Sequence, residues 1–262
     1  MKKLFYLVLL TTFFLFSCSS NNDENAQVAP ANSLKKITET VYYNSSYIDY
    51  SSATFNYENG KLASISNNNN TNLLKFTYNN DLIVEVNSYT NNNLVAKNIV
   101  VHNGNLITSI TNSDNTEREL FFYNAGILST KMNQSMSNTT NNWTTYLTTN
   151  YTFNNGNIIT ERFIYNDNNN MISDYSYEYD SKLNPMTYMP NDLKYIIGSL
   201  ESLDFVSKNT DIKTYKYQST NFSDPTLLYS SEITYNSNNL PIKIKKYKSN
   251  GVLFSEADFE YN

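Results

Sequence analysis

Few side chains in this sequence are of the types that catalytic and metal sites need. His102 is the only histidine and Cys18 is the only cysteine. A Ser–His–Asp or Cys–His apparatus would have to use His102, and zinc would find no further histidine or cysteine ligand. Since His102 falls where a hairpin turn is expected, we interpret it as a solvated turn residue. The sequence therefore predicts no catalytic site, no cofactor and no metal site.

Carboxylates are the remaining candidates for chemistry. Asp114, Glu117 and Glu119 lie in and beside one expected loop, and a pair of carboxylates could support glycoside hydrolysis. The run at residues 167–170 weakly resembles a calcium loop, but it lacks the glycine and the final glutamate of that motif. Surface acids at this density are expected in any folded domain. We therefore interpret both groups as hydrophilic loop residues and predict that the protein is not an enzyme.

Two aromatic side chains, Trp143 and Tyr146, fall beside an expected loop, and Trp143 is the only tryptophan. Aromatic rings at a rim can stack on sugar rings or anchor a protein partner. Both residues are therefore candidates for ligand binding. The alternative is that Trp143 covers a sheet edge, because the next strand is expected to begin beside it.

The first residues form an export signal. Lys2 and Lys3 precede an apolar run that is too short for a permanent membrane span. The run ends in Leu-Phe-Ser-Cys at residues 15–18, which resembles the lipobox of bacterial lipoproteins. This resemblance implies a signal peptide over residues 1–17, lipidation of Cys18 and a disordered polar tether over residues 18–33. A cleaved secretory signal with an unmodified cysteine is the alternative.

Composition restricts the class of partner. Charged residues make up 16% of the chain and the net charge is −5, so no basic cluster is available to bind phosphate backbones and nucleic acid is not expected as a partner. Four lysines near the C-terminus, at positions 243, 245, 246 and 248, are interpreted as a solvated strand face. Aromatic residues make up 15% of the chain, which favours a folded domain.

One repeated unit organises residues 34–262. Two aromatic or aliphatic residues at alternate positions are followed by a turn rich in Asn, Asp or Gly, and then by Leu or Ile. Period-two alternation predicts a strand with the pair on one face, and the turn residues tolerate the positive φ of tight hairpins. The pairs are Phe55/Tyr57, Phe76/Tyr78, Ile99/Val101, Phe121/Tyr123, Tyr151/Phe153, Tyr177/Tyr179, Ile233/Tyr235 and Phe259/Tyr261.

The repeat resembles the YD-type repeats of the RHS family, whose core is Tyr-Asp-x-x-Gly-x-Leu. The best matches begin at Tyr57 and Tyr179, although Asp is usually replaced by Asn or Glu and Gly is often missing. The whole combination resembles uncharacterised Bacteroidota lipoproteins with degenerate repeats of this kind. RHS proteins enclose toxic cargo in large shells, whereas this chain is too short for a shell, so the resemblance implies a strand pattern and no activity.

Two strands per repeat predict roughly 14 to 17 antiparallel strands, and open sheets rarely exceed about ten strands without curling or splitting. We therefore expect an all-β fold in which a single curved or coiled sheet of repeated β-hairpins carries one inserted helix. A closed β-barrel is the alternative. The domain begins and ends on half-repeats, so its terminal strands are either edges or partners of each other.

The helix is expected within residues 190–205, where Leu193, Ile196, Ile197 and Leu200 have helical spacing. We expect it to lie on the aromatic face or to plug the curved sheet. The other ends of the hairpins are expected to carry longer loops, and such loops are where binding functions commonly lie.

The acidic residues Asp23 and Glu24 soon after Cys18 resemble the flank that directs Bacteroidota lipoproteins to the outer surface. This resemblance implies a lipid-anchored protein of the outer membrane that is exposed on the cell, with a periplasm-facing anchor as the alternative. The leading hypothesis is a non-enzymatic surface scaffold for adhesion or protein interaction. The second is a glycan-binding accessory protein of a polysaccharide-uptake system.

Overall fold

The computed structural model describes residues 29–44, 47–166, 171–201, 206–217 and 225–262. Within these residues the chain forms sixteen antiparallel strands and one α-helix. The strands are β1 Leu34–Asn44, β2 Tyr47–Glu58, β3 Lys61–Ser66, β4 Asn72–Asn79, β5 Leu82–Thr90, β6 Asn93–Asn103, β7 Leu106–Asn112, β8 Glu117–Asn124, β9 Ile127–Met136, β10 Trp143–Asn154, β11 Asn157–Tyr165, β12 Ile172–Leu183, β13 Asn209–Tyr217, β14 Thr226–Tyr235, β15 Pro241–Lys248 and β16 Leu253–Tyr261. The helix α1, Asn191–Glu201, lies between β12 and β13 in the chain.

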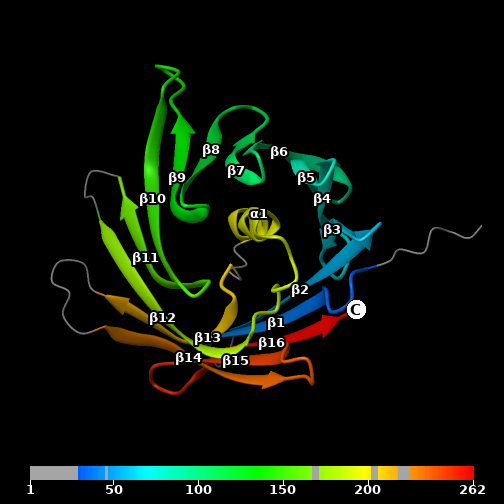
Figure 1. Ribbon diagram of the computed structural model, residues 1–262, viewed down its shortest axis with the longest axis vertical. Helices are drawn as coiled ribbons and strands as arrows, with labels where there is room; N and C mark the ends of the chain where they lie inside the picture. The colour runs from blue at the N-terminus through cyan, green and yellow to red at the C-terminus, as the bar shows by residue number, and fades with distance from the viewer. Residues whose placement is uncertain (1–28, 45–46, 167–170, 202–205, 218–224) are drawn as a thin grey trace, which may run out of the picture.

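The sheet closes into a barrel (Figure 1), because β1 pairs with β16 and every other strand pairs with its neighbours in sequence. The expectation of an open curved sheet is therefore wrong, and the alternative of a closed barrel is correct. An open sheet would leave the backbone groups of both terminal half-repeats unpaired. Pairing Ile37 with Phe259 removes both edges at once.

Tight hairpins at one end of the barrel follow the sequence prediction. The turn between β2 and β3 has positive φ at Asn59 and Gly60, and the turn between β10 and β11 has it at Asn155 and Gly156. Two-residue hairpin loops require this backbone, which Asn and Gly tolerate. We call this the tight-turn end, and the opposite end, where β1–β2, β5–β6 and β9–β10 connect, the loop end.

Connections at the loop end are shorter than the sequence predicts. Strands β5 and β6 extend to a tight turn at Asn91 and Asn92 in place of one of the longer loops. Asn67 and Asn112 each close a short turn with the side-chain Oδ1, which accepts the backbone N–H of the threonine four residues later at 2.9 Å. Asparagine side chains thus stabilise turns that composition alone presents as loops.

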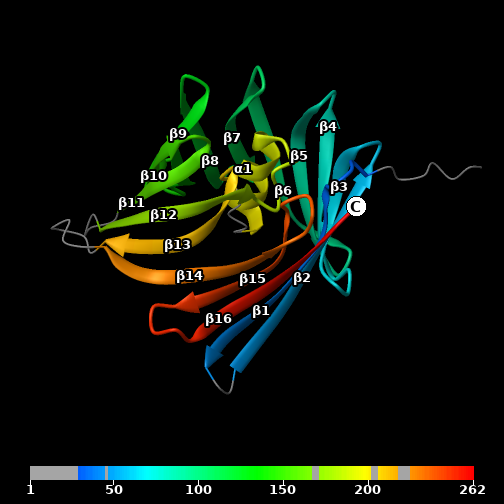
Figure 2. The same ribbon diagram turned by 60° about the horizontal axis from the view of Figure 1, so that its bottom comes forward.

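The helix α1 lies inside the ring of strands (Figures 1 and 2). Ile196 and Ile197 are fully buried, and the rings of Tyr195 on α1 and Phe121 on β8 are 6.5 Å apart. A ring of sixteen strands is wide enough to leave a lumen, and α1 fills part of it. The expected helix that plugs the sheet is confirmed up to residue 201, and residues 202–205 lie outside the described residues. No helix in the described residues is long and apolar enough to cross a membrane.

Toward the tight-turn end, the inner face of the barrel wall is apolar. Phe55, Phe121 and Phe259 point inward and are at most 5% exposed. Residues one position further along the same strands, such as Asn56 and Glu260, point outward because side chains alternate along a strand. The predicted role of the pairs as core is confirmed at these positions. It is wrong for Ile99 and Val101, which are exposed on the outer face, because Val100 between them is the buried residue.

The ordered chain begins before residue 34. Ser33 is 4% exposed, its carbonyl oxygen accepts the backbone N–H of Asn262 at 3.0 Å, and Asn32 donates to the Asn262 carbonyl at 3.1 Å. The expectation of a disordered tether over residues 18–33 is therefore wrong for its last residues, which pack beside the end of β16. Cys18 and the signal over residues 1–17 lie outside the described residues.

Candidate ligand-binding site

The inner face of the wall changes character along the barrel axis. On β8 the inward side chains run from Glu117 and Glu119 near the loop end to Phe121 and Tyr123 near the tight-turn end, because alternate residues share a face. β9 shows the same change in reverse, from buried Leu128 to Lys131 and Asn133. The tight-turn half of the lumen is thus apolar and holds α1, whereas the loop half has a polar lining.

Two adjoining cavities occupy the lumen beside α1. One, of about 240 Å³, lies between the helix and strands β8 to β11, and the other, of about 230 Å³, lies against β11 to β15. Both are lined by Ile158 and Glu161. Their aromatic walls are formed by Phe121, Tyr151, Phe163 and Tyr195 in the first and by Tyr175, Tyr177, Tyr179 and Tyr229 in the second. We call the two together the luminal cup.

Glu161 is the carboxylate at the centre of the luminal cup. It is 5% exposed, and the Tyr177 hydroxyl donates a 2.8 Å hydrogen bond to its Oε2. The rings of Phe163 on β11 and Tyr175 on the adjacent β12 meet edge to face, with their centroids 5.6 Å apart. Lys131 lines the first cavity and Lys246 the second. The cup thus combines aromatic faces with two acidic groups, Glu161 and Asp211, and two basic groups.

Buried polar atoms without partners lie on neighbouring strands of the cup wall. They are Oε2 of Glu119 on β8, Oδ1 of Asn133 on β9 and Oγ1 of Thr149 on β10. Glu119 pairs in register with Asn133, and Lys131 pairs with Thr149. Buried polar atoms are normally hydrogen-bonded to protein or water. This wall therefore offers unused hydrogen-bonding capacity to a molecule in the lumen.

The two aromatic candidates from the sequence lie on opposite faces of the wall. Trp143 is on the outer face, where the Arg118 guanidinium lies 4.2 Å from its ring and Arg118 donates to Gln134 at 2.7 Å. Tyr146 occupies a bulge in β10. Partial burial raises the pKa of Tyr146, and the inward-facing Glu117 raises it further. The structure therefore brings Tyr146 to the lumen and leaves Trp143 outside.

The acidic candidates do not converge. Asp114 lies in the β7–β8 turn, where its Oδ1 accepts the Thr116 hydroxyl at 2.9 Å. Glu119 is held in the wall by Asn133 at 2.6 Å and by Lys131 at 3.4 Å. Among the described residues no cluster of acidic, histidine or cysteine side chains is arranged to hold a metal. The run at 167–170 lies outside the described residues.

His102 is not the solvated turn residue that the sequence suggests. Its side chain is 6% exposed, its Nε2 is 4.0 Å from Asp192 Oδ2 of α1, and that nitrogen has no hydrogen-bond partner. Burial lowers the pKa of His102, and Asp192 opposes this effect. His102 is buried because α1, which is distant in sequence, packs over the end of β6.

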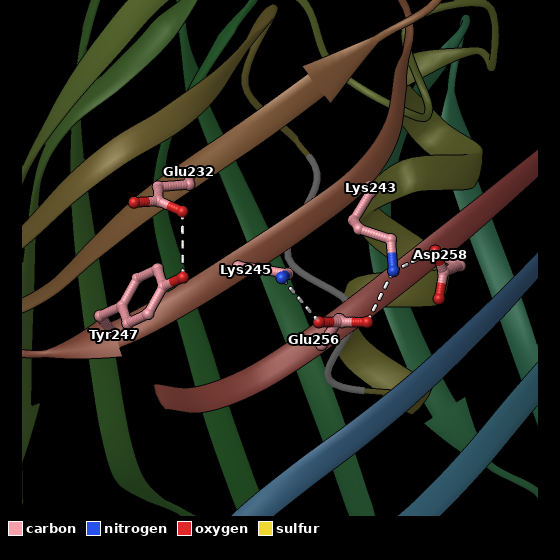
Figure 3. A network of polar contacts seen from close by, with 6 residues as sticks. All are labelled: Glu232, Lys243, Lys245, Tyr247, Glu256 and Asp258. Carbon is pink, nitrogen blue, oxygen red and sulfur yellow. Dashed lines mark hydrogen bonds and ion pairs between the residues drawn. The ribbon is translucent and has the colours of Figure 1, made fainter. Parts of the chain in front are cut away.

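Alternation along β15 divides the lysines that were expected to form one solvated face. Lys243 and Lys245 point outward, where Lys243 lies 2.6 Å from Glu256 and 3.0 Å from Asp258, and Lys245 lies 3.4 Å from Glu256 (Figure 3). The Tyr247 hydroxyl donates to Glu232 at 3.0 Å on the same face (Figure 3). Lys246 points the other way and lines the luminal cup.

Sequence reasoning missed the cup because its residues come from strands β8 to β15. Glu161 and Lys131 each follow a buried aliphatic residue by three positions, Ile158 and Leu128, on strands that return from a tight turn. That recurrence of a charged residue on the aliphatic strand is the signal that could have identified them.

No protein-family model and no curated protein sequence matches this chain. Among solved structures, the barrel is similar to a porin-like protein from Bacteroides uniformis ATCC 8492, with a TM-score of 0.57 and 10% identity over 90% of this chain and 100% of that one. A porin-like protein from Bacteroides vulgatus ATCC 8482 matches with a TM-score of 0.47 and 12% identity over 87% and 98% of the two chains. The first similarity shows a shared closed-barrel fold.

Proposed function

We propose that this chain is a lipid-anchored, non-enzymatic binding protein whose luminal cup holds a glycan. The observation that carries the proposal is the pair of adjoining cavities that share Glu161 and are walled by tyrosines. This assigns the protein to the second of the two functions that the sequence allows, a glycan-binding accessory protein of a polysaccharide-uptake system.

The chemistry of the cup suits a sugar. Aromatic rings offer flat apolar faces to the C–H surfaces of a pyranose, and a few placed polar groups then fix its orientation. Tyr175 and Phe163 supply such faces, and Glu161 and Lys131 supply an acceptor and a donor for ring hydroxyls.

The outer wall supports a barrel that stands in water. A membrane-spanning barrel presents an apolar band to lipid and a polar interior, whereas here ion pairs such as Arg162–Asp174 and Lys97–Glu85 lie on the outer face and buried aromatic residues such as Phe55 and Phe121 lie inside. Membrane attachment is then the role of the proposed lipid on Cys18. The proposed location is the cell-facing surface of the outer membrane, with the periplasmic face as the alternative.

The anchor would orient the barrel. The chain enters it at Leu34, which pairs with Tyr261 at the tight-turn end. A tether from Cys18 therefore holds that end toward the membrane and directs the loop end, with its polar lumen, away from it. The proposed resemblance to YD-type repeats fits this arrangement, since the repeats build the wall and contribute no reactive group.

A second candidate function is contact with a protein, as in the scaffold hypothesis. Ile48, Tyr50, Leu94 and Val95 at the loop end are each more than half exposed. Tyr50 and Val95 line one open cleft of about 750 Å³. Exposed apolar residues that gather at one rim are typical of interaction sites. A photo-crosslinking residue at Val95 should trap a surface partner in cells, and equal trapping from Glu260 on the outer wall would contradict this role.

A glycan array followed by calorimetry tests the main proposal. We expect Tyr175→Ala and Glu161→Gln to weaken binding of the best glycan about tenfold or more, since each removes a central contact. Trp143→Ala on the outer face is the matched control and should bind normally. Failure to bind any glycan, or loss of binding in Trp143→Ala but not in Tyr175→Ala, would contradict the luminal site.

A further inference from the structure

A separate cavity of about 370 Å³ lies at the tight-turn end, beside the first turn of α1. Its walls come from the β8–β9 turn at Gly126, the β10–β11 turn at Asn155 and Gly156, and the helix residues Asn191 and Lys194. Lys208, which precedes β13, completes it. It shares Tyr195 and Val206 with the first cavity of the luminal cup, but neither Lys194 nor Lys208 lines the cup.

Lys194 is the unusual residue of this cavity. Lys194 is only 5% exposed. Its ammonium group makes no ion pair or hydrogen bond with the described residues. Burial lowers the pKa of Lys194, and no carboxylate among the described residues counteracts this shift. Burying an ammonium group without a partner destabilises the fold. A bound anion would remove that cost.

The rest of the cavity is suited to an anion as well. The described residues that line it include two lysines and no aspartate or glutamate, in a chain whose net charge is −5. Lys208 is held in place because its backbone N–H donates to the Gly156 carbonyl at 3.0 Å and its side chain rests against that glycine. Gly156 has φ +84°, and a Cβ there would meet Lys208 Cβ at 3.4 Å.

The helix adds positive potential at the same place. The first turn of a helix carries partial positive charge from its free N–H groups, and Asn191 and Lys194 are both in the first turn of α1. The acid of that turn, Asp192, does not line the cavity. Its Oδ1 accepts the Leu193 N–H at 2.8 Å and its Oδ2 faces His102. Asn155, Asn191 and Thr187 supply further polar groups around the cavity.

From this geometry we infer that Lys194 and Lys208 form a binding site for a phosphate group at the tight-turn end of the barrel. Two sources of that chemistry are possible, a soluble phosphorylated molecule and the headgroup of a membrane lipid. The site does not depend on glycan binding in the luminal cup.

The test uses the mature full-length chain carrying Cys18→Ala, which removes the proposed lipid. Inorganic phosphate is titrated against it by calorimetry and by thermal unfolding at constant ionic strength, with chloride as the reference anion. We expect phosphate to stabilise the fold and Lys194→Met to weaken phosphate affinity about tenfold or more, because a charge-assisted hydrogen bond is lost. Without phosphate, Lys194→Met should unfold at the same or a higher temperature, since it removes a buried charge. A stable variant that has lost the phosphate response separates binding from folding.

Lys208→Ala, at an exposed residue, should weaken phosphate binding without affecting the fold. Lys75→Met, which removes a lysine from the outer face of β4, is the matched control and should respond to phosphate as the parent does. Vesicles of phosphatidic acid and of phosphatidylcholine then identify the source. A Lys194-dependent preference for phosphatidic acid assigns the site to a lipid headgroup, and phosphate binding without that preference assigns it to a soluble ligand. If neither probe binds, or if Lys194→Met binds as the parent does, the inference is wrong.

Discussion

The hydroxyl of Tyr78 on β4 donates a 2.9 Å hydrogen bond to the carbonyl oxygen of Leu62 on β3. The last backbone pair between these strands is Ser64 with Lys75. The tyrosine therefore binds a carbonyl that lies beyond the paired part of the two strands. The same relationship recurs at Tyr57 with Leu34 (2.9 Å), Tyr179 with Ile158 (2.6 Å) and Tyr261 with Pro241 (2.7 Å). In each case the acceptor lies two residues, and the tyrosine three residues, beyond the last backbone pair.

This recurrence explains the order of residues in the four pairs that end in Tyr57, Tyr78, Tyr179 and Tyr261. The pairs Ile99/Val101 and Tyr151/Phe153 have no hydroxyl at the second position. The first member, such as Phe55, Phe76 or Phe259, needs only an apolar ring to pack in the core. The second member joins two successive hairpins where their strands separate, and a hydroxyl is required for that. Tyr78→Phe should therefore lower the free energy of unfolding by about 1 kcal/mol, measured by urea denaturation. Tyr50→Phe, at an exposed rim position, is the control, and an equal loss in both variants would contradict this role.

The second prediction concerns two adjacent phenylalanines on β8. Phe121 is 4% exposed and points at α1, whereas Phe122 is 44% exposed on the outer wall. Phe121→Ala should destabilise the protein by about 3–5 kcal/mol because it leaves a cavity in the core. Phe122→Ala should change stability by no more than about 0.5 kcal/mol. Denaturation of the two variants side by side checks the assignment of inner and outer faces, and a larger loss from Phe122→Ala would reverse it.

The third prediction is loss of stability at alkaline pH. Burial raises the pKa of Tyr57 and of Tyr195 from 10.0 to about 12. A raised pKa means that the fold prefers the neutral phenol, so this contribution is complete below pH 10 and is lost as the pH rises toward 12. The free energy of unfolding should fall over this range. Tyr195→Phe should reduce the slope, and a slope identical to that of the parent would contradict the assignment.

The sequence predicts local pairing well because pairing in a meander is a local property. The Asn-Gly turn at residues 59–60 and the alternation of Phe55, Asn56 and Tyr57 specify a hairpin and its inner face with no knowledge of the rest of the chain. Closure is different, since Ile37 and Phe259 meet from opposite ends of the domain. The sequence around each residue does not indicate that it pairs with the other, so the repeat is equally consistent with an open sheet and with a barrel.

The candidate site was less predictable for the same reason. Tyr146 could be identified from its residue type. Glu161 is buried by Tyr177 on the next strand and by α1, which its local sequence does not show. His102 was misassigned because the helix that covers it is distant in sequence. Trp143 was identified by its rarity, and rarity does not determine which face of a strand a residue occupies. Contacts across the barrel decide these roles, and no short sequence window contains them.

The fourth prediction separates the two ways in which a barrel can be attached to a membrane. The outer wall carries Lys243 and Arg162 in ion pairs with acidic residues on neighbouring strands, and charged side chains facing lipid cost about 2–4 kcal/mol each near the bilayer centre. The proposed lipid on Cys18 is then the whole attachment. Cys18→Ala should therefore move the folded protein from the membrane fraction to the soluble fraction. A barrel that spans the bilayer would stay in the membrane fraction without its lipid, so unchanged fractionation of a folded Cys18→Ala variant would overturn both the anchor and the water-exposed wall.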